Sequence, residues 1–320
     1  MIGKTRGQFG FADLEVEQAV GRQGFLERVN RLIDWAPFEQ RLAGVFKDSP
    51  RGRPSYPVLV HFKVLLLAQW YGLSDPMAEE ALADRLSFRS FVGLSLQDRT
   101  LDETTICRFR NRLAELGLMG ELLAELDRQL CAKGLVVKRG TLVDASLVKA
   151  QSRPVNKSAP KQPKDREAAW TVKRGQGLYG YKFHAGVDLD TSLIRRATLT
   201  PANVPEGRCF DELLPEDEAA VFADCAYSTK ARRKALRARG VYPGILAKGY
   251  YRKKLSPGER RRNARLRPIR SGVERVFGTL KRSYALERAR YLGLARNLNH
   301  ALLQAFAYNL KKTVALAGAA

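Results

Sequence analysis

The chain has 320 residues, a length that suggests about two domains. A composition of 45% hydrophobic and 28% charged residues is ordinary for a soluble globular protein with room for a sizeable core. Lys and Arg number 56 against 33 Asp and Glu, so the formal net charge is +23. Such a surplus favours a polyanionic partner, and nucleic acid is the first expectation.

Several classes of protein are excluded at this stage. The most apolar stretch, residues 58–70, is interrupted by His61 and Lys63 and is too short to span a bilayer. Residues 1–4 lead into a polar segment with no apolar signal core, so we expect a cytoplasmic protein without a membrane partner. The four cysteines form no C-x-x-C pair, which argues against a zinc site or a disulfide framework.

The positive charge is concentrated in one part of the chain. Residues 1–135 hold 18 basic and 18 acidic residues, and residues 136–229 hold 14 and 12. Residues 230–290 hold 21 basic residues against three glutamates, a surplus of +18. This basic segment also carries enough apolar residues to fold, so we expect a folded basic surface rather than a disordered tail.

Residues 1–135 are expected to form a helical, DNA-binding domain. Apolar residues recur at helical spacing, and the region near 75–116 resembles a helix-turn-helix. Its last helix, predicted to begin after an Asp102 N-cap, would expose Arg108, Asn111 and Arg112, side chains that suit phosphates and base edges. An ordinary helical bundle with solvated arginines is the alternative.

A segment at 151–177 is rich in Lys, Pro, Ser and Gln and shows no hydrophobic period, which indicates a surface linker. Trp170 stands out within it. This residue is a candidate DNA contact, stacking on a base as aromatic side chains do in single-strand channels. The alternative is that Trp170 pins the linker to the core.

The region 136–295 alternates between strand and helix patterns. We predict strands at 140–144, 181–188, 193–199, 219–224 and 242–246, and helices at 205–214, 228–239 and 269–284. The order β-β-β-α-β-α-β-α indicates an α/β fold, with a mixed sheet that begins as an antiparallel meander and continues with parallel crossovers. Residues 296–320 are expected to form a C-terminal helix and tail.

Three carboxylates lie at informative places in this pattern. Asp144 is expected to end the first strand, Asp224 ends the fourth, and Glu274 lies on the late helix inside the basic segment. If the two strands are neighbours, both aspartates lie at one edge of the sheet. Oxygen ligands suit Mg²⁺ or Mn²⁺, and two ions roughly 4 Å apart can hold the oxygens of a phosphodiester. The alternative for Glu274 is a salt bridge with Arg270 or Lys281 at helical spacing.

Four segments carry a resemblance to a known family. They are Thr141-Leu-Val-Asp144-Ala-Ser, Tyr179-Gly-Tyr-Lys-Phe-His-Ala-Gly-Val-Asp188, Val221-Phe-Ala-Asp224-Cys-Ala-Tyr227 and Arg270-Ser-Gly-Val-Glu274-Arg-Val-Phe-Gly-Thr-Leu-Lys281. Taken in order, they resemble the DDE transposases of bacterial insertion sequences. The resemblance is greatest to the insertion-sequence-five group of the insertion-sequence-four superfamily.

The resemblance implies a ribonuclease-H-like core with Asp144, Asp224 and Glu274 as the catalytic, metal-binding triad. Such enzymes use two Mg²⁺ ions to cleave transposon ends and then join the freed 3′-hydroxyl to target DNA. It further implies double-stranded DNA as the partner, in the form of terminal inverted repeats and target DNA. A homodimer on that DNA, associated with the bacterial nucleoid, is expected.

The resemblance also indicates DNA contacts around Glu274. The family signature is Tyr, two residues, Arg, three residues, Glu, six residues, Lys. Arg270, Glu274 and Lys281 match this spacing, whereas Arg267 stands at the Tyr position. Lys182, on the strand that resembles the family, is a further candidate phosphate contact. A stand-alone nuclease on the same core and a non-catalytic DNA-binding protein derived from a transposase are the alternative functions.

Overall fold

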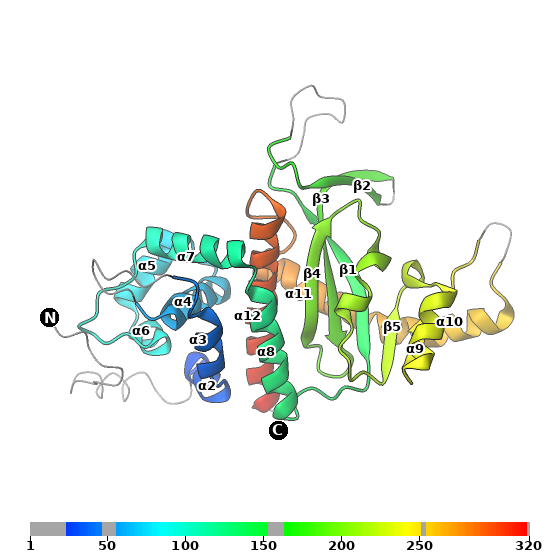
Figure 1. Ribbon diagram of the computed structural model, residues 1–320, viewed down its shortest axis with the longest axis horizontal. Coiled ribbons are helices and arrows are strands. Elements are labelled where there is room, and N and C mark those ends of the chain that lie inside the picture. The colour runs from blue at the N-terminus through cyan, green and yellow to red at the C-terminus, as the bar shows by residue number, and fades with distance from the viewer. Residues whose placement is uncertain (1–23, 47–55, 153–162, 174, 251–253, 319–320) are drawn as a thin grey trace. The chain divides into compact units, whose positions relative to one another are not determined.

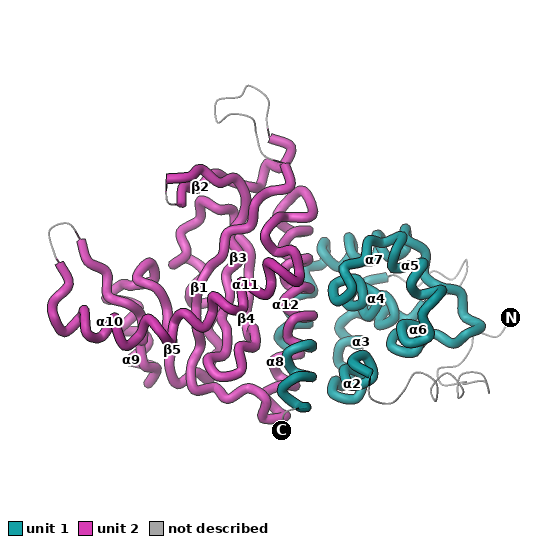
Figure 2. Tube along the Cα trace, turned by 180° about the vertical axis from the view of Figure 1, so that it is seen from behind, with its two compact units in different colours: residues 1–125, 310–320 teal, residues 126–309 magenta. Residues whose placement is uncertain are grey.

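The computed structural model describes residues 24–46, 56–152, 163–173, 175–250 and 254–318. The chain divides into two compact units (Figure 2). Unit 1 comprises residues 1–125 and 310–320, and unit 2 comprises residues 126–309. Within the described ranges, no helix has both the length and the hydrophobicity needed to cross a membrane.

Unit 1 is helical, as predicted. Its helices are α2 (Phe25–Leu32), α3 (Ala36–Leu42), α4 (Val58–Tyr71), α5 (Asp75–Asp84), α6 (Leu86–Val92), α7 (Glu103–Leu116) and the first part of α8 (Met119–Ala132). Helix α4 forms the core, because every residue from Val60 to Ala68 is buried. Among them, the ammonium of Lys63 donates to Asn30 Oδ1 at 2.9 Å and to the Phe91 carbonyl at 3.1 Å.

Helices α5, α6 and α7 occupy the region expected to resemble a helix-turn-helix. The Ser74 hydroxyl caps α5, and the Asp102 carboxylate caps α7 by accepting the Thr105 N–H at 2.7 Å, so the predicted Asp102 N-cap is confirmed. Arg110 on α7 donates two hydrogen bonds to Asp75 on α5, at 2.6 and 2.7 Å. This bidentate pair fixes the packing of the last helix against the first.

Unit 2 is built on a six-stranded mixed sheet (Figure 1). Its strands are β1 (Thr141–Lys149), β2 (Ala169–Lys173), β3 (Gln176–Asp188), β4 (Ile194–Pro201), β5 (Ala220–Ala223) and β6 (Tyr242–Ile245). Strand β3 pairs antiparallel with β1, β2 and β4, whereas β5 pairs parallel with both β1 and β6. The path β4-β3-β1-β5-β6 therefore has a meander followed by parallel strands, which is the predicted ribonuclease-H-like arrangement.

Two parts of the predicted strand and helix order differ from the structure. The segment 151–177 is not all linker, because its last residues form β2, an edge strand held by β3. The helix predicted over 205–214 is wrong: two 3-10 turns, η1 (Glu206–Cys209) and η2 (Asp211–Leu213), lie there. The Leu213 carbonyl oxygen lies 2.2 Å from where a Cβ of Gly186 would be, so this backbone packs directly on the sheet.

The remaining elements of unit 2 are η3 (Cys225–Tyr227), α9 (Lys230–Ala238), α10 (Pro257–Arg270), α11 (Gly272–Tyr284) and most of α12 (Leu294–Ala317). The helix predicted over 269–284 starts too late, because helical structure begins at Pro257 and divides at Ser271. Ser256 and Glu259 form a capping box with Pro257 at the first helical position, which explains this earlier start.

A buried ion cluster holds α8 to the sheet within unit 2. Arg195 on β4, whose side chain is 2% exposed, donates to Asp127 on α8 at 2.9 Å. It also pairs with Asp217 at 3.2 Å and with the buried carboxylate of Glu218. Since Arg195, Asp127 and Glu218 are buried away from water, these three charges are stable only while they remain paired.

We therefore expect Arg195→Met to destabilise the protein by about 3–5 kcal/mol, because it leaves the buried carboxylate of Glu218 without its cation and Asp127 with only the longer contact to Arg196 at 3.5 Å. Urea unfolding followed by circular dichroism measures this loss. Arg139→Met is the matched control, since Arg139 is 72% exposed in its pair with Asp190 and an exposed pair contributes about 1 kcal/mol or less. Equal losses in the two variants would contradict the prediction.

Candidate active site

The parallel pairing of β1 with β5 brings Asp144 and Asp224 together. The register aligns Val143 with Ala223, so the residue that follows in each strand is an aspartate. Asp224 comes directly after its strand, which ends one residue earlier than predicted, and caps η3 by accepting the Cys225 N–H at 2.6 Å. Asp144 does not end its strand, because β1 continues to Lys149 through its pairing with β3.

Asp144 is the more buried of the two aspartates, at 8% exposure. Burial raises the pKa of its carboxyl to about 6, against the opposing attraction of Arg270. The negative charges of Glu206 and Asp224 add to the rise. A carboxyl whose charge is disfavoured by burial and by like charges, beside the end of a neighbouring strand, is typical of a functional site.

Arg270 joins two of the three predicted carboxylates. It is the last residue of α10, and its Nη1 donates to Glu274 Oε1 on α11 at 2.9 Å. Its Nη2 donates to Asp144 Oδ2. The salt bridge between Glu274 and Arg270, which was the alternative interpretation of Glu274, therefore exists. The same guanidinium also binds Asp144, so Arg270 is part of the cluster of carboxylates.

A hollow of about 370 Å³ opens beside this cluster. Asp224, Glu274, Arg270 and Arg267 all line it. Within the described ranges, no three Asp, Glu, His or Cys side chains are grouped closely enough to hold a metal ion. The position between Asp144 and Glu274 instead holds a guanidinium, so these oxygens already bind a cation.

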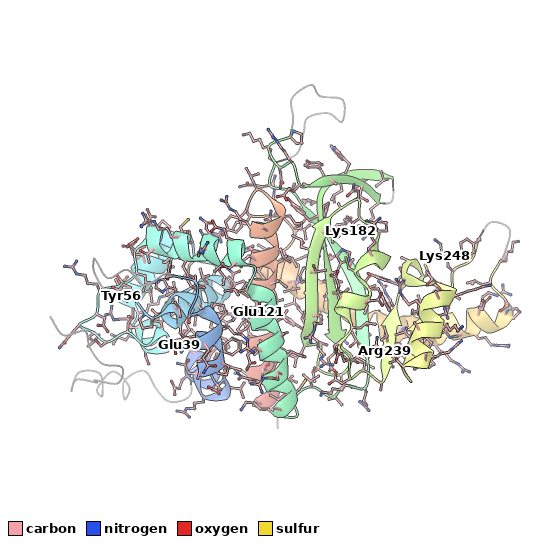
Figure 3. The ribbon with its side chains drawn as sticks, viewed as in Figure 1. Glu39, Tyr56, Glu121, Lys182, Arg239 and Lys248 are labelled. Atoms are coloured by element: carbon pink, nitrogen blue, oxygen red, sulfur yellow. The ribbon has the colours of Figure 1, made fainter. Side chains whose placement is uncertain are left out.

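Two other candidate phosphate contacts lie away from this hollow. Lys281, at the far end of α11, lines a second hollow with Lys149 and Lys173. Lys182 lies on β3 (Figure 3), where its ammonium donates to the Val204 carbonyl at 2.9 Å. Lys182 is thus engaged in an internal hydrogen bond that holds the turn after β4.

Trp170 and His184 have internal partners as well. Trp170 lies on β2 and packs on Tyr179 of β3, with ring centroids 5.3 Å apart. His184 is fully buried on β3, with Nε2 at 2.9 Å from the Thr200 hydroxyl on β4. These contacts hold neighbouring strands together.

The three candidate residues of α7 differ in their surroundings. Arg108 is exposed. Asn111 donates to Cys107 Sγ at 3.6 Å, and Arg112 contacts both the Val45 carbonyl and Glu115. Arg108 is therefore the residue of this face most accessible to a partner.

Two residues near the carboxylates were not singled out from the sequence. Glu206, in η1, contributes to the raised pKa of Asp144. Tyr227, in η3, is fully buried, and burial followed by the charges of Glu206 and Asp144 raises its pKa. Within the described part of the chain, its hydroxyl has no hydrogen-bond partner. Of the two, only Tyr227 lies in a segment that resembles the family, the one that begins at Val221.

Comparison with known proteins identifies two matching families. A family model described as "Transposase DDE domain" matches residues 136–310, and one described as "Transposase domain (DUF772)" matches residues 14–112. Among solved structures, a piggyBac transposase synaptic complex with hairpin DNA is 10% identical with a TM-score of 0.40, and the match covers 96% of this chain and 77% of that one. The Mos1 strand transfer complex is 13% identical with a TM-score of 0.21, covering 85% and 82%.

The buried His184 predicts a loss of stability in acid. Burial lowers its pKa to about 4, whereas the unfolded chain takes up the proton near 6.5. Stability is therefore greatest above pH 6.5 and falls as the pH drops toward 4, by about 2 kcal/mol at pH 5 for this group. Urea unfolding at pH 8 and pH 5 measures the loss. His184→Gln, which can still bond Thr200, should lose about 2 kcal/mol less than the wild type over that interval; an equal loss would refute the assignment.

Proposed function

Because the chain belongs to the transposase DDE-domain family and is a DNA transposase, we propose that Asp144, Asp224 and Glu274 are its catalytic carboxylates. The observation that carries this proposal is the bridging position of Arg270 between Asp144 and Glu274. Burial lowers the pKa of this guanidinium, but the charges of Asp144, Asp224 and Glu274 together raise it above its ordinary value. All three carboxylates thus act on one cation.

Enzymes of this family depend on a divalent metal. We propose that two Mg²⁺ ions, or Mn²⁺ in their place, are held by Asp144, Asp224 and Glu274, whose hard oxygen atoms suit these ions. When bound, such ions stabilise the attacking and leaving oxygens of a phosphodiester during cleavage and strand transfer. The carboxylate oxygens of Asp144 and Glu274 that bind Arg270 would serve as ligands of these ions.

The residues around the hollow that Asp224 and Glu274 line would bind and position the DNA phosphate. Arg270 can transfer its two N–H donors from the carboxylates to phosphate oxygens, which match its planar fork equally well. Arg267 lines the same hollow and adds a second guanidinium beside the scissile phosphate. The Cys225 N–H donates to Asp224 Oδ1, which helps to fix the orientation of this carboxylate.

Further features follow from the resemblance of the sequence. We place the protein in the insertion-sequence-five group of the insertion-sequence-four superfamily. It acts as a dimer on terminal inverted repeats and target DNA, in the bacterial cytoplasm at the nucleoid. In unit 1, Arg108 on the exposed face of α7 is the first candidate to contact the repeats. Asn111 and Arg112 lie about one turn further along the same helix.

We expect Asp144→Asn to abolish both cleavage of transposon-end DNA and strand transfer, because it removes a carboxylate charge from the cluster. DNA affinity should remain nearly unchanged, since the basic surface is intact. Cleavage and joining are measured on labelled duplex carrying the inverted repeat found beside the gene, with Mg²⁺, and affinity is measured on the same duplex.

Asp211→Asn is the matched control, because Asp211 is an exposed carboxylate of η2 in the same unit. It should retain full activity. Cleavage by Asp144→Asn would overturn the assignment. Pre-cut ends separate the alternatives: a stand-alone nuclease cleaves without forming joined product, and a non-catalytic protein does neither.

Withdrawal of metal should stop the reaction without unfolding the protein. With EDTA present, we expect no cleavage but a protein that remains folded and unfolds cooperatively, because Arg270 still balances Asp144 and Glu274. Adding Mg²⁺ or Mn²⁺ should restore activity, whereas Ca²⁺, which prefers more ligands at longer distances, should restore less. Thermal unfolding and cleavage assays on one sample test both parts, and cleavage in EDTA would contradict the metal assignment.

A further inference from the structure

A second hollow of unit 2, of about 960 Å³, is lined by four cationic side chains together with polar and apolar residues. We name it the hairpin hollow. It is formed by the end of β1 (Leu147, Lys149, Ala150), the β2–β3 hairpin (Lys173, Gln176, Gly177, Leu178, Tyr179) and the end of α11 with the segment after it (Lys281, Ala285, Glu287, Arg288). Figure 1 shows the hairpin projecting at one end of the sheet.

Four cations face this hollow, against one carboxylate. They are Lys149, Lys173, Lys281 and Arg288. Glu287 pairs with Lys149 at 2.6 Å, and both side chains are more than half exposed, so the pair contributes little to holding the fold. Burial lowers the pKa of Lys281, and the neighbouring Lys173 lowers it further. Like charges brought this close favour an anionic occupant.

The hairpin hollow is connected to the carboxylates by two elements that run in the same direction. Arg270 joins Asp144 of β1 to Glu274 of α11 at one end. At the other end, Lys149 of β1 and Lys281 of α11 line the same hollow. The two ends are about 16 Å apart along β1 and about 10 Å apart along α11.

This spacing matches a nucleic-acid strand. With one phosphate per ~3.4 Å of each strand, 10–16 Å corresponds to roughly three to five nucleotides. Lysine side chains are flexible point charges, which suit phosphate oxygens rather than base edges.

Internal packing holds the β2–β3 hairpin in place beside the hollow. The Trp170 ring lies 3.5 Å from the position a Cβ of Gly177 would take, and it packs on Tyr179. This packing holds Lys173, at the end of β2, opposite Gln176 of β3. Trp170 thus positions the hairpin through internal contacts.

We propose that the hairpin hollow binds the phosphate backbone of the DNA strand that leads away from the carboxylates, about three to five nucleotides from the phosphate held there. This inference rests on the proposed function and adds Lys149, Lys173 and Arg288 to the DNA contacts. Glu287 opposes the strand and limits the affinity of the hollow.

The test measures the affinity of the full chain for a fluorescent 40-base-pair duplex over a range of salt concentrations. In the Asp144→Asn background, Lys173→Gln with Arg288→Gln should raise Kd and reduce the slope of log affinity against log salt by about 1.8, or 0.9 per lost phosphate contact. The matched control, Lys133→Gln with Arg139→Gln, removes two exposed cations from the segment between α8 and β1 and should leave the slope unchanged.

A variant with the opposite effect sharpens the test. Glu287→Gln should tighten binding and increase the slope, because it frees Lys149 from its pair. Glu212→Gln, which removes an exposed acidic residue from η2, should do neither. Equal changes in the hollow variants and their controls, or no change in any of them, would overturn the proposal.

Chemical footprinting provides a readout on the unsubstituted protein. The duplex should protect Lys149 and Lys173 from acetylation, measured by mass spectrometry, and should leave Lys133 reactive. Absence of protection at Lys149 and Lys173 refutes the hollow as a DNA site. Protection together with cleavage by Asp144→Asn would instead uphold the hollow and refute the proposed triad.

Discussion

The parallel pairing of β1 with β5 covers only three residues of each strand, and the arrangement of the candidate active site follows from where it stops. Strand β5 ends at Ala223, so the chain turns at Asp224 directly beside Asp144. Strand β1 continues, held by its long antiparallel pairing with β3. At Lys149 the backbone of Glu287 and Ala289 joins its edge. The stretch of β1 between these two pairings lies between the carboxylates and the hairpin hollow.

The positive charge of the basic segment has a structural part and a surface part. Arg233 and Arg262 both donate to the Ile245 carbonyl, and Arg232 donates to the carbonyls of Tyr227 and Gly207. These arginines hold the ends of β6 and η3 together. Others, such as Arg239 beside α9, lie on the surface (Figure 3). The +18 of this segment therefore overstates the charge available to DNA.

The general plan of the fold could be predicted from the sequence, since it depends on local patterns. Alternation and turn residues predicted the strands, and their order allowed the strands of Asp144 and Asp224 to be neighbours without requiring it. The early start of α10 was missed although the capping box at Ser256 is a local signal. The effect of Glu206 on the pKa of Asp144 depends on packing between distant segments. The same is true of the position of Lys149 and Lys281 in one hollow. No local pattern reports them.

The same reasoning explains the error at 205–214. Its apolar residues, including Cys209, Phe210 and Leu213, are buried in the core, and their spacing suits a helix as well as a pair of tight turns. The close approach of Leu213 to Gly186 favours the pair of tight turns over a helix, because the backbone itself must lie against the sheet. Such a contact requires a glycine from another strand, which cannot be identified from the segment alone.

The guanidinium of Arg270 keeps its proton at any pH found in a cell. It is therefore a permanent internal counter-ion for Asp144 and Glu274, supplied by the chain as it folds. Because this counter-ion is part of the chain, the fold around the two carboxylates can form without any cation from solution.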